Sequence, residues 1–281
     1  MTPIATAELN ESLDQFVLTW RMLARPFPAA EIADKPGFAL SWANIPFVFY
    51  NTTFLTEPLS DARVLKNRIA EALAHLHSKS SPGWIVVCAD QLSGAAREKL
   101  AQIAEEAKLT PLPMTGMVGD IAPLPESPRP ELRFVRISDD ATITDFVDLN
   151  CAAYGVPIEA GRSIVKEHTF WRNHAYGFVA YKGDQPVATA TAIVNGDCLL
   201  LFLVATAADQ RRNGYADAVV RRALNAAHQA TGIRRTVLHA TEMGAPVYLR
   251  MGYHATGRFV GYLPQAGRTK VACCAESSAR S

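Results

Sequence analysis

The stretch that decides the fold is Leu201–Ala218, LFLVATAADQRRNGYADA, in which an apolar run passes through a short polar turn into a helical pattern. A buried strand that leads directly into a helix leaves the first N–H groups of that helix without partners. These groups, together with the positive end of the helix dipole, favour a bound anion. The junction therefore predicts a phosphate-binding site.

The residues inside this junction suit a pyrophosphate. Gly214 lets the backbone approach oxygen atoms because it has no Cβ, and Ala216 keeps the first helical turn narrow. Arg211 and Arg212 offer charge-assisted hydrogen bonds to the same oxygens. The stretch contains neither the Gly-Lys-Ser/Thr run of an NTPase nor a Gly-x-Gly-x-x-Gly run, so these two nucleotide-binding interpretations fail.

A second motif, GAPVYLRMGY at Gly244–Tyr253, follows one predicted strand later. The run Arg211-x-x-Gly214-x-Ala216 and this Y-x-x-x-G-Y pattern together resemble the two signatures of the GNAT acetyltransferases, in the same order and at a similar separation. The likeness extends over Leu132–Leu263 and, more loosely, over the N-terminal half. It implies an α/β (α+β) fold with a mixed central sheet flanked by helices.

The resemblance also implies an activity. GNAT enzymes transfer the acetyl group of acetyl-CoA to an amine by direct attack, so we expect a primary amine of a small molecule or of an amino-acid-like substrate as acceptor. In the family, unpaired backbone groups of one strand hold the pantetheine and polarise the thioester carbonyl. The cofactor-binding residues implied here are Phe202, Leu203, Val204, Arg211, Arg212, Asn213, Gly214, Tyr215 and Ala216.

Two residues are candidates for catalysis, and the resemblance implies the first of them. Tyr248 matches the family position that protonates the leaving thiolate, for which a phenol is a suitable donor at neutral pH, although a tyrosine packed on the sheet is the alternative. Glu242 is the nearest acidic candidate for the base, and a solvated residue or helix cap explains it equally well. Other candidates are Glu167 and His168 on a neighbouring predicted helix, His239 on a strand, or a chain of water molecules.

Hydrophobic spacing predicts the remaining elements. The predicted helices are Ala7–Arg25, Asp61–His77 with Ser60 as N-cap, Ala95–Lys108, Ala141–Ala153, Glu159–Phe170, Tyr215–Thr231 and Ala245–Met251. The predicted strands are two within Gly37–Thr56, then Trp84–Ala89, Met114–Asp120, Leu132–Ile137, Gly177–Lys182, Pro186–Val194, Leu199–Thr206, Thr236–Ala240 and Thr256–Leu263.

The proline-rich run PLPESPRP at Pro123–Pro130 predicts an extended linker between two domains. The expected organisation is a degenerate GNAT-like domain at 1–122, a linker at 123–130, a catalytic domain at 131–265 and a flexible tail at 266–281. Both halves repeat one order of strands and helices, which suggests a duplication. The N-terminal copy is expected to be inactive, because Glu57 and Asp61 stand where a phosphate needs positive charge.

Composition excludes several classes of partner. Lys plus Arg (28) nearly balance Asp plus Glu (27), so the basic excess for nucleic acid or an anionic membrane is missing. No basic patch with an apolar block begins the chain, and no apolar run reaches the ~20 residues of a membrane span, so a cytoplasmic protein is expected. The five cysteines are scattered, which predicts reduced thiols and no metal site.

Two matters stay open at this point. Nothing in the sequence determines an oligomeric state. Because the apolar strand Leu199–Ala205 contains no carboxylate or histidine that would serve as a base, a non-catalytic acyl-CoA-binding regulatory or scaffold protein is the alternative function. Transfer of an acyl group longer than acetyl is a narrower alternative.

Overall fold

The computed structural model describes residues 3–164 and 168–265. Its contacts divide the chain into two units. The described residues of unit 1 lie within Met1–Ile121, Asn195–Leu200 and Arg235–Gly267, and those of unit 2 lie within Ala122–Val194 and Leu201–Arg234. This division differs from the sequence-based limits of 1–122 and 131–265, because two strands from the end of the chain pair with strands of the N-terminal half.

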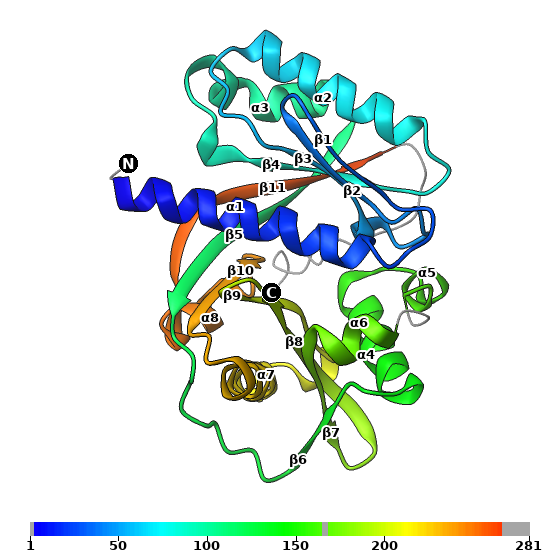
Figure 1. Ribbon diagram of the computed structural model, residues 1–281, viewed down its shortest axis with the longest axis vertical. Helices are drawn as coiled ribbons and strands as arrows, with labels where there is room; N and C mark the ends of the chain where they lie inside the picture. The colour runs from blue at the N-terminus through cyan, green and yellow to red at the C-terminus, as the bar shows by residue number, and fades with distance from the viewer. Residues whose placement is uncertain (1–2, 165–167, 266–281) are drawn as a thin grey trace, which may run out of the picture. The chain divides into compact units, whose positions relative to one another are not determined.

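Unit 1 is a mixed sheet with helices packed on it (Figure 1). In spatial order its strands are β1 (Glu31–Lys35), β2 (Phe38–Trp42), β3 (Asn51–Leu55), β4 (Trp84–Cys88), β11 (His254–Pro264), β5 (Leu109–Asp120) and β10 (Arg235–Ala240). Strands β3 and β4 run parallel, whereas β11 is antiparallel to both β4 and β5. Its helical elements are α1 (Pro3–Ala24), η1 (Val48–Tyr50), α2 (Ala62–His77), η2 (Ala89–Gln91), α3 (Gly94–Glu106) and α8 (Ala245–Met251).

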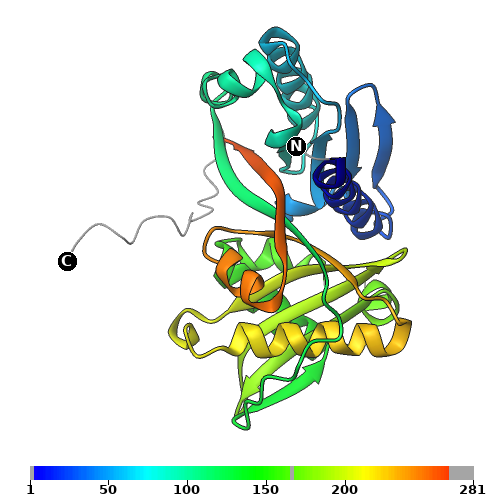
Figure 2. The same cartoon turned by 90° about the vertical axis from the view of Figure 1, so that its left-hand side faces the viewer.

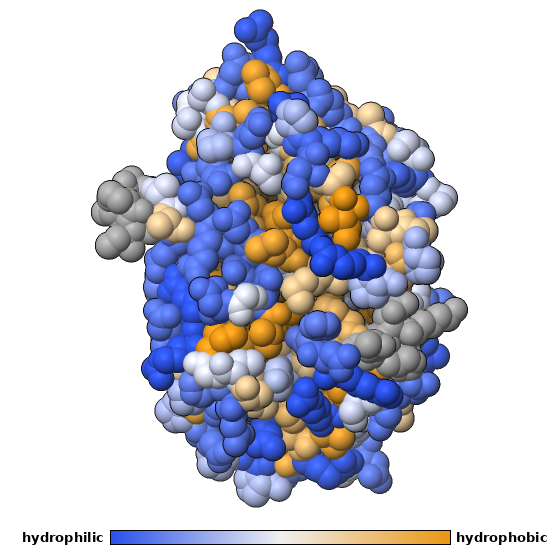
Figure 3. Space-filling model, viewed as in Figure 1, coloured by the Kyte–Doolittle hydropathy of each residue, from blue (hydrophilic) through white to orange (hydrophobic). Residues whose placement is uncertain are grey.

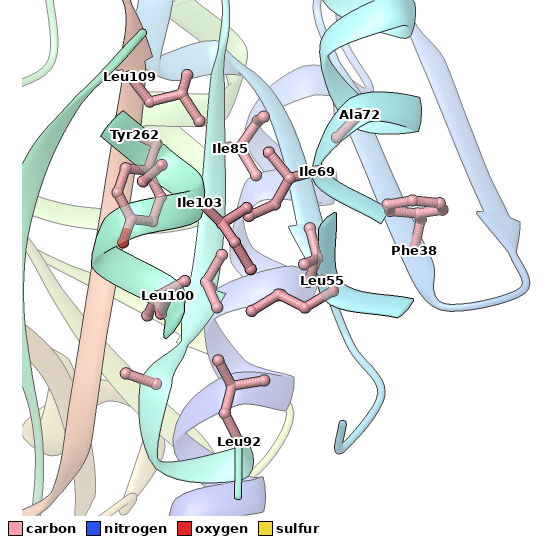
Figure 4. Close-up of a cluster of buried hydrophobic side chains, with 14 of the residues drawn as sticks. Phe38, Leu55, Ile69, Ala72, Ile85, Leu92, Leu100, Ile103, Leu109 and Tyr262 are labelled. Atoms are coloured by element: carbon pink, nitrogen blue, oxygen red, sulfur yellow. The ribbon is translucent and has the colours of Figure 1, made fainter. Parts of the chain in front are cut away.

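The two faces of this sheet pack against different helices. Leu55 and Ile85 belong to a buried cluster with residues of α2 and α3 (Figure 4). Their chain neighbours Phe54 and Trp84 point the other way, because side chains alternate along a strand, and there they meet Phe16 of α1. The ring centroids of Phe16 and Phe54 are 5.1 Å apart. Helix α1 therefore covers one face, and α2 and α3 cover the other.

Unit 2 holds the remaining strands, in the spatial order β9 (Cys198–Thr206), β8 (Gln185–Asn195), β7 (Ala175–Lys182) and β6 (Leu132–Arg136). Its helical elements are α4 (Asp140–Tyr154), α5 (Ile158–Arg162), α6 (His168–Asn173), η3 (Ala208–Gln210) and α7 (Tyr215–Thr231). Helix α7 packs across these strands and contacts β7 (Figure 2). Strand β9 begins in unit 1 and ends in unit 2.

Helices α7 and α8 begin and end at the predicted residues, which confirms both predictions. Strand β1 was not predicted, because EIADK lacks a clear apolar alternation and forms a partly exposed edge. Strand β5 is longer than predicted and includes Pro111 and Pro113. These prolines are tolerated because β10 pairs only with residues 115–120 of β5, so no strand of the described chain pairs with the proline-containing part on that side.

Two further predictions were wrong in detail. The single helix expected at Glu159–Phe170 is replaced by the short α5 and α6. The Ser163 hydroxyl donates a 2.6 Å hydrogen bond to the carbonyl of Ala160, a local bond that competes with helix continuation. The N-cap of α2 is Asp61 rather than Ser60. The predicted tail at 266–281 lies outside the described residues.

No helix within residues 3–164 and 168–265 is both long enough and apolar enough to cross a membrane. The face drawn in Figure 3 is largely hydrophilic, and its hydrophobic groups form separate patches.

Candidate functional site

The junction between β9 and α7 has the backbone geometry of an anion site. Gly214 is the N-cap of α7 and adopts a left-handed conformation with φ 76°. Among the described residues no side chain caps this helix end, so its first N–H groups are not used by a protein side chain. The residues after the cap, Tyr215 and Ala216, carry two of these groups. Tyr215 itself is buried and anchors the start of the helix.

Arg129 reaches this junction from the proline-rich segment. Its Nε donates a 3.3 Å hydrogen bond to the carbonyl oxygen of Asn213. A Cβ built on Gly214 would lie 2.4 Å from a terminal nitrogen of Arg129, so the guanidinium rests directly against the glycine. Arg129 thus adds a cation to the junction that sequence reasoning missed, because the residue lies far away along the chain.

The segment that carries Arg129 is held along α7. The Leu124 N–H donates a 2.7 Å hydrogen bond to Asn225 Oδ1, and Asn225 Nδ2 donates back to the Leu124 carbonyl at 2.8 Å. Arg221 donates a 2.9 Å hydrogen bond to the carbonyl of Pro125. These contacts position the proline-rich segment beside the helix whose N-terminus forms the junction.

The predicted arginines lie at the exposed side of the junction. Arg211 is partly exposed, whereas Arg212 is exposed and has a left-handed φ of 66°. Asn213 is also exposed, and its Nδ2 donates a 3.1 Å hydrogen bond to the Gln210 carbonyl, which closes the turn. Two cationic side chains and a tight turn therefore precede the helix.

Strand β9 is irregular at the three predicted residues. Phe202, Leu203 and Val204 are partly exposed, whereas the residues of β9 before them are buried. Leu203 has φ 48°, a left-handed conformation that a leucine rarely adopts. Such a residue interrupts the regular ladder and turns its peptide groups out of line. The prediction that the strand Leu199–Thr206 is buried is therefore wrong at these residues.

Two hydroxyl groups hold the carbonyls of this irregular segment. Tyr154 donates a 2.9 Å hydrogen bond to the Val204 carbonyl, and Thr189 Oγ1 donates to the Leu203 carbonyl at 3.3 Å. Burial raises the pKa of Tyr154 to about 12, so its hydroxyl keeps its proton near neutral pH. Asn150 Nδ2 in turn donates a 3.0 Å hydrogen bond to Thr189 Oγ1. Buried polar residues such as Asn150 and Thr189 inside apolar elements were the available sequence signal.

The predicted catalytic residues belong to unit 1, whereas the predicted cofactor-binding residues belong to unit 2. Tyr248 lies in α8, is 8% exposed, and makes an edge-on contact with the Tyr253 ring at 5.9 Å between centroids. Glu242 lies between β10 and α8 and is exposed. It makes neither a hydrogen bond nor an ion pair with the part of the chain that the structure describes.

The other candidates for the base are mostly unsuited or undescribed. His239 stacks on Phe16 with 3.9 Å between ring centroids, and its Nε2 lies 3.1 Å from Ser12 Oγ. Burial lowers the pKa of His239 to about 3, so the imidazole is a weak base and has the role of a core histidine. Glu167 lies outside the described residues, and the side chain of His168, at the start of α6, does as well.

Comparison with known proteins places this geometry in a family. Residues 143–253 match the model of the acetyltransferase (GNAT) family. A GCN5-related N-acetyltransferase from Kribbella flavida is similar in structure, with a TM-score of 0.63 and 14% identity, over 91% of this chain and 96% of that chain. A protein of unknown function from Staphylococcus epidermidis is also similar, with a TM-score of 0.61 and 14% identity, over 85% of this chain and 95% of that chain.

A GCN5-related N-acetyltransferase-like protein from Streptococcus suis gives a TM-score of 0.54 and 15% identity, over 92% of this chain and 98% of that chain. At these identities the likeness shows the fold. No curated protein matches the chain. The matched segment contains the β9–α7 junction, the irregular strand and α8. Residues 143–253 therefore carry the match of this chain to the acetyltransferase (GNAT) family, a family of acyltransferases.

Proposed function

We propose that the protein is an N-acetyltransferase that transfers the acetyl group of acetyl-CoA to a primary amine of a small molecule or of an amino-acid-like substrate. The observation that carries the proposal is the β9–α7 junction inside the family match, where a left-handed Gly214 begins a helix that no side chain of the described residues caps. We infer that Arg211, Arg212 and Arg129 contribute positive charge to the same pyrophosphate.

The residues at the junction fit this cofactor. A pyrophosphate is an acceptor-only anion, and the junction offers backbone N–H groups and guanidinium groups, which only donate. The close approach of Arg129 to Gly214 fills the space of a Cβ, so the backbone and the cation are able to contact the same anion. The irregular segment at Phe202, Leu203 and Val204 is proposed to bind the pantetheine through its turned peptide groups.

Acetyl-CoA supplies an activated thioester, and the residues of the chain orient it and move protons. In the proposed reaction the amine nitrogen forms a bond to the acetyl carbon as the carbon–sulfur bond breaks. Tyr248 gives its hydroxyl proton to the departing sulfur, and the proton lost by the amine passes to Glu242 or to water. This role requires the Tyr248 hydroxyl to reach the sulfur.

The N-terminal unit is proposed not to bind CoA, because α2 begins in a different way from α7. Asp61 caps α2, and its Oδ1 accepts hydrogen bonds from the N–H groups of Arg63 at 2.7 Å and Val64 at 3.3 Å. A carboxylate therefore already occupies the donors that an anion would need. At α7 the corresponding cap is Gly214, which has no side chain.

Calorimetry with acetyl-CoA, followed by a free-thiol release assay over a panel of amines, tests the proposal. We expect binding of acetyl-CoA and thiol release with at least one amine. The exposure of Glu242, which carries no stabilising contact in the described chain, favours one second candidate, an acyl-CoA-binding regulatory protein without turnover. Binding without thiol release for every amine would favour that candidate, and absence of binding would reject both.

A further inference from the structure

Unit 1 contains a cavity that none of these roles uses. It has a volume of about 340 Å³ and lies between α2 and the strands β2 and β3. The sheet contributes Phe38, Leu40 and Thr53 to its lining, and α2 contributes Arg68, Glu71 and His75. All of them lie outside the residues proposed for cofactor binding and acyl transfer, so the inference below does not depend on that proposal.

The register of the strands explains the shape of this cavity. Leu40 and Thr53 are direct partners in the antiparallel β2–β3 pair, so their side chains lie side by side on one face. Phe38, on the same face, lies at the margin of the buried cluster near α2 (Figure 4). The Arg68 guanidinium lies 5.3 Å from the centre of the Phe38 ring. The cavity therefore combines an apolar floor with a polar wall.

Three polar atoms of the lining residues are buried without a hydrogen-bond partner in the described protein: Thr53 Oγ1, Arg68 Nε and His75 Nε2. Thr53 is only 1% exposed. His75 Nε2 lies 4.0 Å from Glu31 Oε2, which is too long for a hydrogen bond. Because nearly all buried polar atoms in proteins are paired, three unpaired atoms around one cavity point to a polar ligand.

The lining residues offer donors more than acceptors. The terminal nitrogens of Arg68 are engaged by Glu71 Oε2 at 3.0 Å and Glu57 Oε2 at 3.5 Å, so these two carboxylates are already paired. Lys35 also lines the cavity, and its ammonium makes no ion pair within the described residues. Burial lowers the pKa of His75, so its imidazole is neutral near pH 7. A group that only accepts hydrogen bonds, such as a carboxylate, complements these donors.

We propose that this cavity binds a small organic acid with one carboxylate and an apolar body. The carboxylate accepts hydrogen bonds from Thr53 Oγ1, His75 Nε2 and the Lys35 ammonium. The apolar body lies against Phe38 and Leu40. The site belongs to the N-terminal unit and gives that unit a binding function of its own.

Calorimetry on the full chain with phenylacetate tests the proposal, because this acid combines one carboxylate with an apolar ring. Phenylacetamide has nearly the same shape without the charge, and phenethylamine has the opposite charge. We expect phenylacetate to bind with one site per chain and phenylacetamide to bind at least about tenfold more weakly, since a charge-assisted hydrogen bond is lost. Phenethylamine is expected not to bind.

Two variants and one control assign the binding to the cavity. Thr53→Val removes the hydroxyl at almost constant volume, and Lys35→Gln removes a cation at an exposed hairpin end. Each is expected to weaken phenylacetate binding about tenfold. Lys66→Gln is the control, because Lys66 also lies on α2 but pairs with Glu106 at 2.8 Å and does not line the cavity. It is expected to leave phenylacetate binding unchanged.

Because Thr53 Oγ1 has no partner in the described protein, Thr53→Val is expected to keep the melting temperature of the ligand-free protein. If the Thr53→Val variant unfolds, the phenylacetate affinity of the Lys35→Gln variant alone tests whether the acid binds in this cavity. Equal affinities for phenylacetate and phenylacetamide would mean that the cavity binds only the apolar ring. Tighter binding of phenethylamine would mean that the cavity selects a cation and not an anion. No heat with phenylacetate at about 10 mM would mean that the cavity holds water only. Each of these three results overturns the proposal.

Discussion

The guanidinium of Arg129 lies against Gly214, so closely that a Cβ on the glycine would come within 2.4 Å of an arginine nitrogen. The two residues come from segments far apart in the sequence, and the hydrogen bonds between Asn225 and Leu124 hold these segments together. The fold itself thereby brings a cation to the start of α7.

Substitution of Gly214 by Ala is expected to weaken acetyl-CoA binding about tenfold or more, because the added Cβ displaces Arg129 from the junction. Gly232→Ala is the matched control. Gly232 caps the other end of α7 with φ 74°, and a Cβ there meets nothing within 4 Å. Calorimetry and thermal unfolding should show that both variants lose about 1 kcal/mol of stability and that only Gly214→Ala loses affinity. Equal affinities would disprove the role of the junction.

Substitution of Arg129 by Gln is expected to weaken acetyl-CoA binding about five- to tenfold, because one charge-assisted contact to the pyrophosphate is lost. The remaining affinity should depend less on salt concentration, since fewer charges attract the anion. Binding isotherms at two salt concentrations measure both effects. Arg133→Gln serves as control, because Arg133 of β6 lies over the ring of Tyr181 on β7. If the acetyl-CoA affinity of the Arg129 variant depended on salt as strongly as that of the original protein, Arg129 would not contact the pyrophosphate.

Replacement of Tyr248 by Phe is expected to lower turnover at least about tenfold while the affinity for acetyl-CoA stays the same. Only protonation of the departing thiolate is lost. Tyr253→Phe removes a buried hydroxyl from the partner in the same ring pair and should keep turnover. Steady-state kinetics and calorimetry separate the two parameters. A parallel loss of turnover and affinity would indicate a structural role for Tyr248.

The charge cluster around Arg235 predicts a stability change in acid. Burial opposes ionisation of Glu8, but hydrogen bonds from His254 and Arg235 outweigh it and hold the pKa of Glu8 below its ordinary value of 4.5. A carboxylate with a depressed pKa stabilises the fold above its unfolded pKa, and this contribution is lost as the pH falls through the folded value. Stability should therefore decrease below about pH 4.5.

Glu8→Gln tests this assignment. At pH 7 the variant should lose about 1 kcal/mol of unfolding free energy, because Arg235 loses one of its partners at a site where the Glu8 side chain is 21% exposed. Its stability should fall less between pH 5 and pH 3 than that of the original protein. Glu98→Gln, at an exposed position of α3, is the control and should follow the original pH profile. Denaturant titrations at several pH values measure these changes.

Local patterns predicted the helices better than the strands. The bounds of α7 and α8 followed from hydrophobic spacing, and the structure shows that Gly232 and Gly252 end these helices in left-handed conformations. Strand β1 and the first half of β5 form because they pair with β2 and β11. A local sequence pattern does not show which strands will pair. The prolines of β5 favour a break in the strand, and they are tolerated because no described strand pairs with that part of β5 on the β10 side.

The predicted cofactor-binding residues all lie within the stretch Leu201–Ala218, so sequence reasoning named them together. The residues that hold the irregular strand, Tyr154 and Thr189, come from α4 and β8, and only the fold brings them to β9. The left-handed Leu203 has no side-chain signature, because leucine is ordinary in a buried strand. Arg129 lies in a segment that the sequence predicts to be a linker, and a basic residue in a linker gives no sign of a binding role.

The position of β11 between β4 and β5 has a consequence for biosynthesis. A ribosome releases β4 and β5 long before His254–Pro264 emerges, so the growing chain carries two unpaired strand edges in its N-terminal part. Pairing between strands so distant in sequence is slow, and the strand edges that stay unpaired until then promote aggregation. Nascent chains that stop before His254 should therefore require chaperones, although every residue of β1 to β5 has already been made.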